Sequence, residues 1–108
     1  MEISAIIIDD EQNARSNLRM LLEDYCPEVT VVAEAQSAAE AREMIATHHP
    51  QLLFLDINMP NEDGFELLES LPEKDFSVIF ITAHNQFALK ALKSGAIDYI
   101  EKPIDIDE

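Results

Sequence analysis

Acidic side chains directly follow two of the apolar runs in this 108-residue chain. Asp56 comes immediately after the run 52–55, and Asp9 and Asp10 come immediately after the run 5–8. A carboxylate at the end of a buried strand lies where open α/β sheets bind their ligands. An aspartate also commonly ends a strand and begins a turn, so Asp56 taken alone leaves both interpretations open.

Two further polar groups follow apolar segments later in the chain, namely Thr82 and Lys102. Carboxylates a few ångströms apart repel one another unless they are protonated or share a cation. Mg²⁺ (or Mn²⁺) is the hard, oxygen-binding ion that suits such a cluster. A hydroxyl and a lysine beside that ion would hold a phosphoryl group. Asp56 would then accept this group as the nucleophile.

Alternating strand-like and helix-like patterns are expected to position these groups. Strands are predicted at 3–9, 29–35, 52–56, 78–82 and 98–101. Strands that alternate with helices imply an α/β protein whose parallel sheet has helices on both faces. For five strands the doubly wound, flavodoxin-like order is 2-1-3-4-5, with a switch point between strands one and three. We therefore expect Asp9, Asp10 and Asp56 to share one crevice, with Thr82 and Lys102 on the same rim.

Four helices are expected between the strands, at about 12–26, 37–49, 64–71 and 85–95. In the first of them, apolar residues at helical spacing form one face and polar residues the other. The predicted apolar face comprises Ala14, Leu18, Leu21, Leu22 and Tyr25, and the predicted polar face comprises Arg15, Asn17, Arg19 and Glu23. Residues 105–108 resemble the acidic first turn of a further helix. We therefore expect one domain over 1–108 whose last helix is largely missing.

The composition favours a globular domain that avoids nucleic acids and membranes. The formal net charge is −15, from 22 acidic and 7 basic residues, and such a chain repels phosphates and anionic membrane surfaces. No apolar run approaches the roughly 20 residues that span a bilayer. The N-terminal residues form no secretory leader, and the single cysteine, Cys26, suits a reducing compartment. We expect a cytoplasmic protein.

Four segments together resemble a bacterial two-component response-regulator receiver domain. They are Asp9-Asp10, LDINMPNEDGFELL around Asp56, Thr82-Ala83, and DYIEKP at 98–103. The segment VIFITAHNQFALKALKSGAIDYIEKPI at 78–104 is most similar to receivers of the LytTR (LytR/AlgR) class, whose output domains bind DNA. The resemblance implies a phosphoacceptor signalling domain rather than an enzyme, with only self-catalysed phosphotransfer and slow autodephosphorylation.

The resemblance also implies a metal site. Asp56 would be the phosphoacceptor and one of the ligands of Mg²⁺. Asp10 would be the more direct ligand of the two N-terminal acids, with Asp9 acting partly through water. The backbone carbonyl of Asn58 would complete the set of protein ligands.

Beyond the metal site, the resemblance assigns the phosphoryl contacts and the switch. Thr82, Lys102 and the Ala83 amide would hold the phosphoryl oxygens, and the Lys102–Pro103 peptide bond would be cis. Thr82 and Tyr99 would form the switch that responds to phosphorylation. Tyr99 also fits an ordinary strand tyrosine with a solvated hydroxyl.

The partners implied by the resemblance are a sensor histidine kinase and an output domain on the same chain in the full-length protein. The output domain, absent from these 108 residues, would be that of a DNA-binding transcriptional regulator; the alternative is a stand-alone receiver. A homodimer would use the helix at about 85–95 and the strand at 98–101.

Two other functional classes remain as alternatives. A phosphohydrolase of the haloacid-dehalogenase type also combines an aspartate nucleophile with Mg²⁺, but it would need two aspartates one residue apart after the first strand. Here Asp9 and Asp10 are adjacent. A pseudo-receiver would lack one of the site residues, whereas this chain has all of them.

Overall fold

The computed structural model describes residues 2–57, 59–71, 76–82 and 98–101, with the side chains of Thr82 and of 98–101 left aside. Its five strands are β1 (Ile3–Ile8), β2 (Val29–Ala35), β3 (Leu52–Asp56), β4 (Ser77–Thr82) and β5 (Asp98–Glu101). They form one sheet in the order β2-β1-β3-β4-β5, and every pair of neighbours is parallel. The predicted α/β fold and strand order are therefore confirmed.

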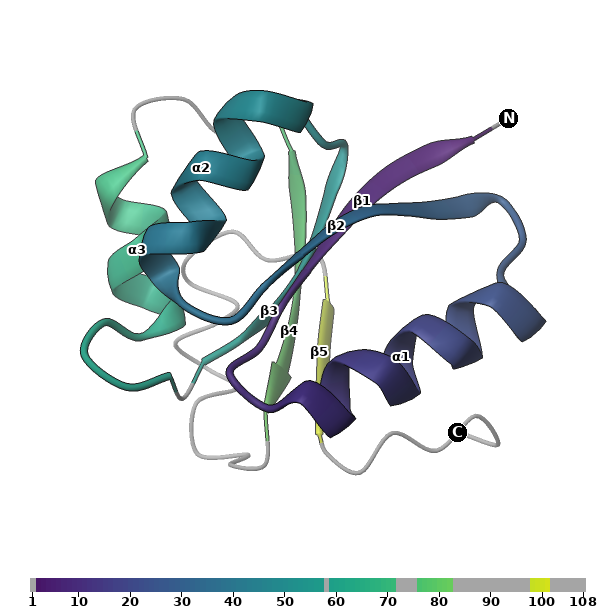
Figure 1. Cartoon of the computed structure of the whole chain (residues 1–108), viewed down its shortest axis with the longest axis horizontal. Helices are drawn as coiled ribbons and strands as arrows, with labels where there is room; N and C mark the ends of the chain where they lie inside the picture. Colours follow the sequence, from purple (N-terminus) through teal and green to yellow (C-terminus); the bar gives the residue numbers. More distant parts are fainter. Residues whose placement is uncertain (1, 58, 72–75, 83–97, 102–108) are drawn as a thin grey trace.

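Three helices are described, and they cover both faces of this sheet. They are α1 (Gln12–Tyr25), α2 (Ala38–His48) and α3 (Gly64–Ser70). Figure 1 shows α2 and α3 on one face and α1 on the other. The helix predicted at about 85–95 and the expected start of a last helix at 105–108 lie outside the described residues.

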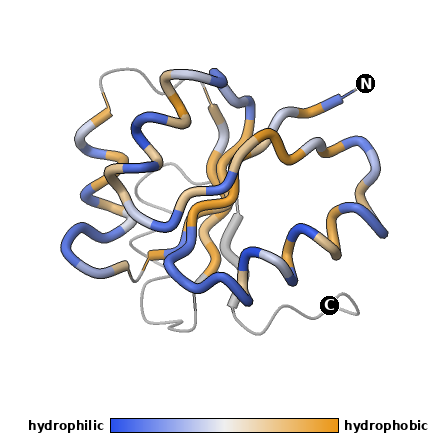
Figure 2. The backbone as a smooth tube through the Cα atoms, in the orientation of Figure 1, coloured by the Kyte–Doolittle hydropathy of each residue, from blue (hydrophilic) through white to orange (hydrophobic). Residues whose placement is uncertain are grey.

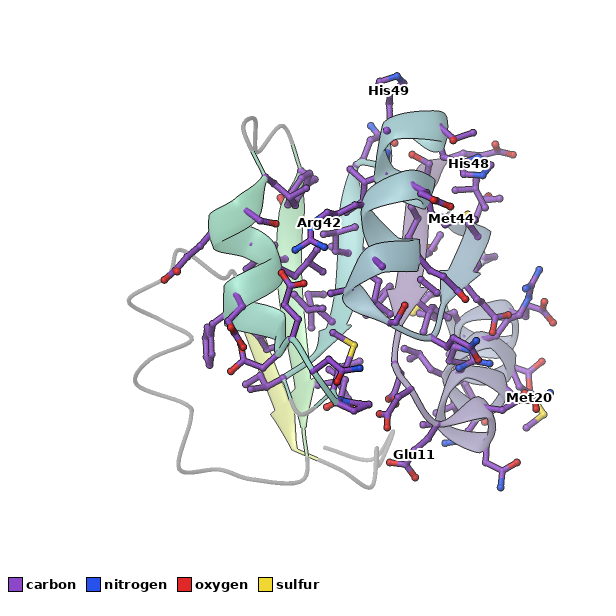
Figure 3. The ribbon with its side chains drawn as sticks, turned by 60° about the vertical axis from the view of Figure 1, so that its left-hand side comes forward. Glu11, Met20, Arg42, Met44, His48 and His49 are labelled. Atoms are coloured by element: carbon purple, nitrogen blue, oxygen red, sulfur yellow. The ribbon has the colours of Figure 1, made fainter. Side chains whose placement is uncertain are left out.

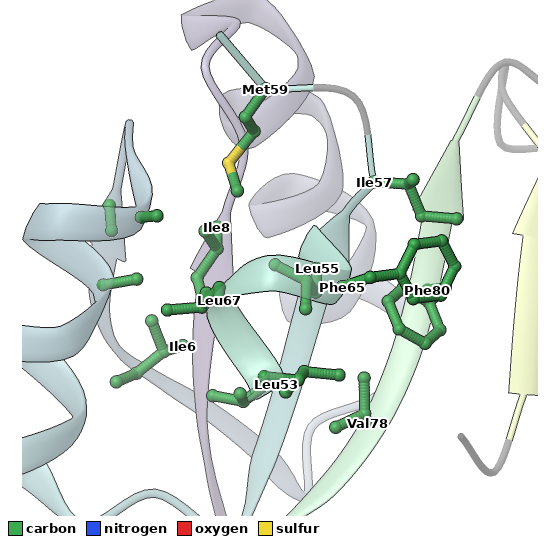
Figure 4. Packing of buried hydrophobic residues seen from close by; sticks show 14 of the residues in the cluster. Ile6, Ile8, Leu53, Leu55, Ile57, Met59, Phe65, Leu67, Val78 and Phe80 are labelled. Atoms are coloured by element: carbon green, nitrogen blue, oxygen red, sulfur yellow. The ribbon is translucent and has the colours of Figure 1, made fainter. Parts of the chain in front are cut away.

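The central strands are apolar along their length because both of their faces are covered. All five residues of β3 are buried, and the hydropathy colouring of Figure 2 shows the apolar strands running together through the middle of the molecule. Beneath α2 and α3, the larger core cluster includes Ile6, Leu53, Leu67 and Phe80. The rings of Phe65 and Phe80 lie 5.0 Å apart between centroids (Figure 4).

A smaller core cluster lies on the α1 side of the sheet. Leu18 and Leu22 pack there with Ile7 of β1 and Phe54 of β3.

Two expectations for α1 were wrong. Tyr25 is 61% exposed rather than part of the apolar face, because it lies in the last turn. Arg15 is mostly buried rather than on the solvated face, with only 13% of its side chain exposed.

Local capping interactions define where the shorter helices begin. Ser37 caps α2 by accepting a hydrogen bond from the Glu40 amide. The Glu40 carboxylate accepts from the Gln36 amide rather than the Ser37 amide, so this cap is not the full reciprocal box. Asp63 and Glu66 form a complete capping box at the start of α3.

Within the described residues, no helix is long and apolar enough to cross a membrane.

Candidate functional site

Three carboxylates from two distant parts of the chain converge at the C-terminal edge of the sheet. One carboxylate oxygen each from Asp9, Asp10 and Asp56 lies within 4.8 Å of the other two. The strand register explains this proximity, because Ile8 of β1 pairs with Leu55 of β3. The next residue on each strand is an aspartate, so the sheet brings Asp9 beside Asp56. The predicted gathering of these three acids is confirmed.

Two of the three acids are removed from solvent. Asp9 is 5% exposed and Asp56 is 4% exposed, whereas Asp10 is exposed. Burial of an ionised carboxylate is costly unless it is paired or hydrogen-bonded. The acidic cluster, called the acidic pocket below, therefore combines two buried carboxylates, Asp9 and Asp56, with an exposed one, Asp10.

Hydrogen bonds to neighbouring elements fix the turn between β1 and α1. The amide of Asp9 donates to the carbonyl of Ala35 at 3.0 Å, which ties the turn to the end of β2. The amide of Glu11, labelled at the start of α1 in Figure 3, donates to Asp9 Oδ1 at 2.9 Å. Arg15 Nη1 donates to the carbonyl oxygen of Asp9 at 2.7 Å. Asp9 is thus held through its amide, its carbonyl and its side chain.

Arg15 is itself held by an acid from β2. Arg15 Nε donates to Glu34 Oε1 at 3.1 Å, and Arg19 Nη1 donates to Glu34 Oε2 at 2.7 Å. The hydrogen bond to Glu34 raises the pKa of Arg19 above its ordinary value. Glu34 therefore binds two guanidinium groups of α1, one reaching the acidic pocket and one on the exposed side of the helix.

The loop after Asp56 returns sharply to the start of α3. The Gly64 amide donates to the carbonyl of Ile57 at 2.9 Å, and Asn61 adopts a left-handed conformation with φ of 72°. Asparagine tolerates this conformation better than most residues. Ile57 and Met59 are buried, so this loop is anchored by apolar side chains (Figure 4).

An ion pair links the same loop to α2. Arg42 contacts the carboxylate of Glu62 through Nη2 and donates from Nε to Ser70 Oγ of α3 at 2.9 Å. Ser70 in turn donates to the carbonyl of Leu67 at 2.6 Å. Figure 3 shows Arg42 extending from α2 toward α3. One side chain thus joins α2, the loop after β3 and α3.

Of the remaining site residues predicted from the sequence, Thr82 and Tyr99 are described by their backbone alone, and the others lie outside the described residues. Thr82 ends β4 one position after Ile81, the partner of Asp56 in the register, and it pairs with Glu101. Tyr99 pairs with Phe80. The predicted roles of Asn58, Ala83, Lys102 and Pro103, including the cis peptide bond, fall on residues outside the described part of the chain.

The described part of the site fits a hard divalent cation. Asp9, Asp10 and Asp56 supply only carboxylate oxygens, the donor type that Mg²⁺ prefers. Chemically, the arrangement places a buried carboxylate, Asp56, beside two others that could hold a cation with it. A carboxylate beside a bound cation could act as a nucleophile toward an electrophile that the cation would polarise.

Arg15 was missed as a functional candidate because it was assigned to the polar face of its helix. A periodicity argument would have found it: Arg15 precedes Leu18 by three residues and Leu22 by seven. These spacings place all three side chains on one helix face. The contact between Arg42 and Glu62 carries no local signal, since 20 residues separate the two positions.

The sequence as a whole matches known proteins along nearly all of its length. A family model described as "Response regulator receiver domain" matches residues 5–108. The chain is 47% identical over 102 residues to the sensory transduction protein LytT of Enterococcus faecalis, covering 93% of this chain and 42% of that protein. It is 39% identical over 104 residues to the transcriptional regulatory protein BtsR of Escherichia coli, covering 95% and 43%. The chain thus spans less than half the length of these relatives.

Solved structures give the same family. The receiver domain of AraT, a response regulator from Geobacillus stearothermophilus, superposes with a TM-score of 0.85 and 34% identity, over 97% of this chain and 84% of that one. A LuxR-family two-component response regulator from Aurantimonas gives a TM-score of 0.87 and 29% identity, over 100% and 79%. The likeness to LytT agrees with the resemblance to the LytTR class. With its sheet order and its three converging aspartates, this chain belongs to the response regulator receiver domain family.

Proposed function

We propose that this domain accepts a phosphoryl group on Asp56 with the help of Mg²⁺ (or Mn²⁺) bound by Asp9, Asp10, Asp56 and the carbonyl of Asn58. The observation that carries the proposal is the approach of three carboxylate oxygens to within 4.8 Å of one another. A divalent cation bound among these carboxylates would offset the repulsion between their like charges. Membership of the receiver family makes a phosphoacceptor the natural purpose of this arrangement.

The transfer is a displacement at phosphorus. One carboxylate oxygen of Asp56 attacks, an O–P bond forms, and the bond from phosphorus to the donor atom breaks. The donor, a phosphohistidine nitrogen of a kinase or the acetate oxygen of acetyl phosphate, leaves with the electron pair. A cation held by Asp9, Asp10 and Asp56 would supply charge compensation for the phosphoryl oxygens and the carboxylate. Asp56 is oriented for this attack by its place at the end of buried β3.

The other phosphoryl contacts are proposed to come from Thr82, the Ala83 amide and Lys102. Supporting this, Thr82 follows the β4 residue that pairs with Asp56, and Lys102 follows Glu101, the β5 partner of Thr82. Thr82 and Tyr99 would form the switch, since Thr82 lies on β4 and Tyr99 lies on the neighbouring strand β5. The Lys102–Pro103 peptide bond would be cis.

The partners follow from the same proposal. A sensor histidine kinase would donate the phosphoryl group, and an output domain on the same chain would respond to it. BtsR, named a transcriptional regulatory protein, is more than twice as long as the part of it matched here, which supports residues 1–108 as the receiver of a longer DNA-binding regulator. This domain would act in the cytoplasm and would itself bind no nucleic acid or membrane. A homodimer would form through the face made by residues 85–95 and 98–101.

Labelling with acetyl phosphate tests the nucleophile. The unmodified domain with Mg²⁺ should gain one phosphoryl group per chain, detected as a mass increase, and chelation of the metal should prevent the gain. Asp56→Asn should gain none, because an amide cannot form the acyl phosphate. Asp24→Asn makes the same charge change at an exposed position of α1 and should be labelled normally. Labelling of Asp56→Asn, or repeated turnover of phosphate monoesters, would contradict the proposal.

A further inference from the structure

We infer that Arg15 is a positioning residue for the acidic pocket, because its guanidinium holds the turn that carries Asp9 and Asp10. This inference rests on the proposed function in one respect, namely that the pocket binds Mg²⁺. Within the described residues, the side-chain hydrogen bonds of Arg15 go to Glu34 and to the carbonyl of Asp9. Its influence on the cation would therefore act through the shape of the turn.

The geometry gives Arg15 two anchors at once. Its Nη1 donates to the Asp9 carbonyl at 2.7 Å, and its Nε donates to Glu34 Oε1 at 3.1 Å. Only 13% of the Arg15 side chain and 26% of the Glu34 side chain are exposed. The planar guanidinium presents these donors in a fixed fork. Arg15 therefore connects the end of β2 to the backbone of the turn after β1.

The turn needs such support because its main chain leaves the sheet at Asp9. The Asp9 amide still bonds to Ala35 of β2, but the Asp9 carbonyl lies beyond the paired residues of β1. Arg15 supplies a side-chain donor to this carbonyl. With the carbonyl fixed, Asp9 Oδ1 can accept from the Glu11 amide at 2.9 Å. The remaining carboxylate oxygen of Asp9 is then held in a defined direction.

The positive charge of Arg15 and its support of the turn predict opposite effects on the affinity of the site for a cation. A guanidinium near the pocket repels Mg²⁺, so its removal would tighten binding if charge were decisive. The ion pair with Glu34 largely offsets this repulsion. Groups that orient the ligands of a metal typically change its affinity 10–100-fold. The loss of support for the turn should therefore outweigh the loss of repulsion, so removal of Arg15 should weaken Mg²⁺ binding.

The test measures Mg²⁺ affinity by titration of the metal alone, without any phosphoryl donor. Arg15→Gln and Arg15→Lys should both bind Mg²⁺ about tenfold more weakly than the unmodified domain. The lysine keeps the charge but cannot reach both acceptors with a rigid fork. Tighter binding by Arg15→Gln, or unchanged binding by Arg15→Lys, would overturn the inference.

Arg19→Gln is the matched control on the same helix. Arg19 pairs with the same Glu34 at 2.7 Å, and its other ion pair in the described part of the chain is with Glu23 of its own helix. Its loss should leave the Mg²⁺ affinity within about twofold. If Arg19→Gln weakened Mg²⁺ binding as much as Arg15→Gln, the effect would belong to Glu34 or to general stability and not to the turn.

A second readout uses the metal-free domain and so stands apart from the proposed function. Hydrogen exchange at the Glu11 amide reports its bond to Asp9 Oδ1. Exchange there should accelerate about tenfold in Arg15→Gln, while the Leu53 amide in the centre of the sheet stays protected. Unchanged Glu11 exchange would refute the positioning role. Failure of the unmodified domain to bind Mg²⁺ would instead refute the proposed function alone.

Discussion

Gly64 packs against the backbone of Asp56 so closely that a Cβ atom at this position would lie 2.8 Å from the Asp56 carbonyl oxygen. The same atom would lie 3.2 Å from Ile57 Cα and 3.2 Å from Leu55 Cγ. Two of these three neighbours are main-chain atoms of the segment that carries the proposed nucleophile. The N-terminus of α3 can therefore approach β3 only because residue 64 has no side chain.

Replacement of Gly64 by alanine should consequently disturb both stability and the site. The added methyl group meets backbone that cannot rotate away, and overpacking of this kind costs about 1–3 kcal/mol. We expect a lower free energy of unfolding in urea and slower labelling of Asp56 by acetyl phosphate. Glu69→Ala, at an exposed position of the same helix, should leave both quantities nearly unchanged. Normal stability of Gly64→Ala would show that the β3–α3 contact can relax.

Binding of Mg²⁺ should stabilise the folded domain by mass action, since the three aspartates meet only in the folded state. At about 100 times the dissociation constant, the gain is about 2.7 kcal/mol, or a rise in Tm of about 10 °C for a domain of this size. Thermal unfolding followed by circular dichroism, with and without the metal, measures this rise.

Asp10→Asn should raise the Tm of the metal-free domain and weaken its response to Mg²⁺. Removing one of three clustered negative charges relieves repulsion, so the Tm without metal should increase. The rise caused by Mg²⁺ should become small, because a direct carboxylate ligand is gone. Asp24→Asn, with the same change in net charge, should keep the full response to Mg²⁺. An equal response in both variants would remove Asp10 from the metal site.

The ion pair between Arg42 and Glu62 should couple α2 to the loop after β3. A double-mutant cycle with Arg42→Ala and Glu62→Ala should give a coupling free energy of about 0.5–1 kcal/mol, decreasing as salt is added. These side chains are 35% and 30% exposed. The Arg19–Glu23 pair, at 45% and 68% exposure and 3.6 Å, should give a smaller value. Equal coupling in the two cycles would mean that the lower exposure of the Arg42–Glu62 pair contributes nothing.

The sequence alone determined the sheet and the identity of its chemical groups. Uninterrupted apolar runs such as 52–55 identify strands covered on both faces, and their alternation with helical periods permits few topologies. Once the order 2-1-3-4-5 is assumed, Asp9 and Asp10 after β1 are expected close to Asp56 at the end of β3, because β1 and β3 are neighbouring strands. These predictions depend on local patterns, which a sequence displays directly.

Only the tertiary structure decided how that site is supported. Arg15 follows the helical period of the buried leucines, yet its partners, Glu34 of β2 and the carbonyl of Asp9 in the turn after β1, belong to other elements and leave no mark in that period. The Arg42 bridge to Glu62 likewise depends on how α2 packs beside α3. Side-chain contacts between distant segments arise from packing in three dimensions, so neither periodicity nor composition encodes them.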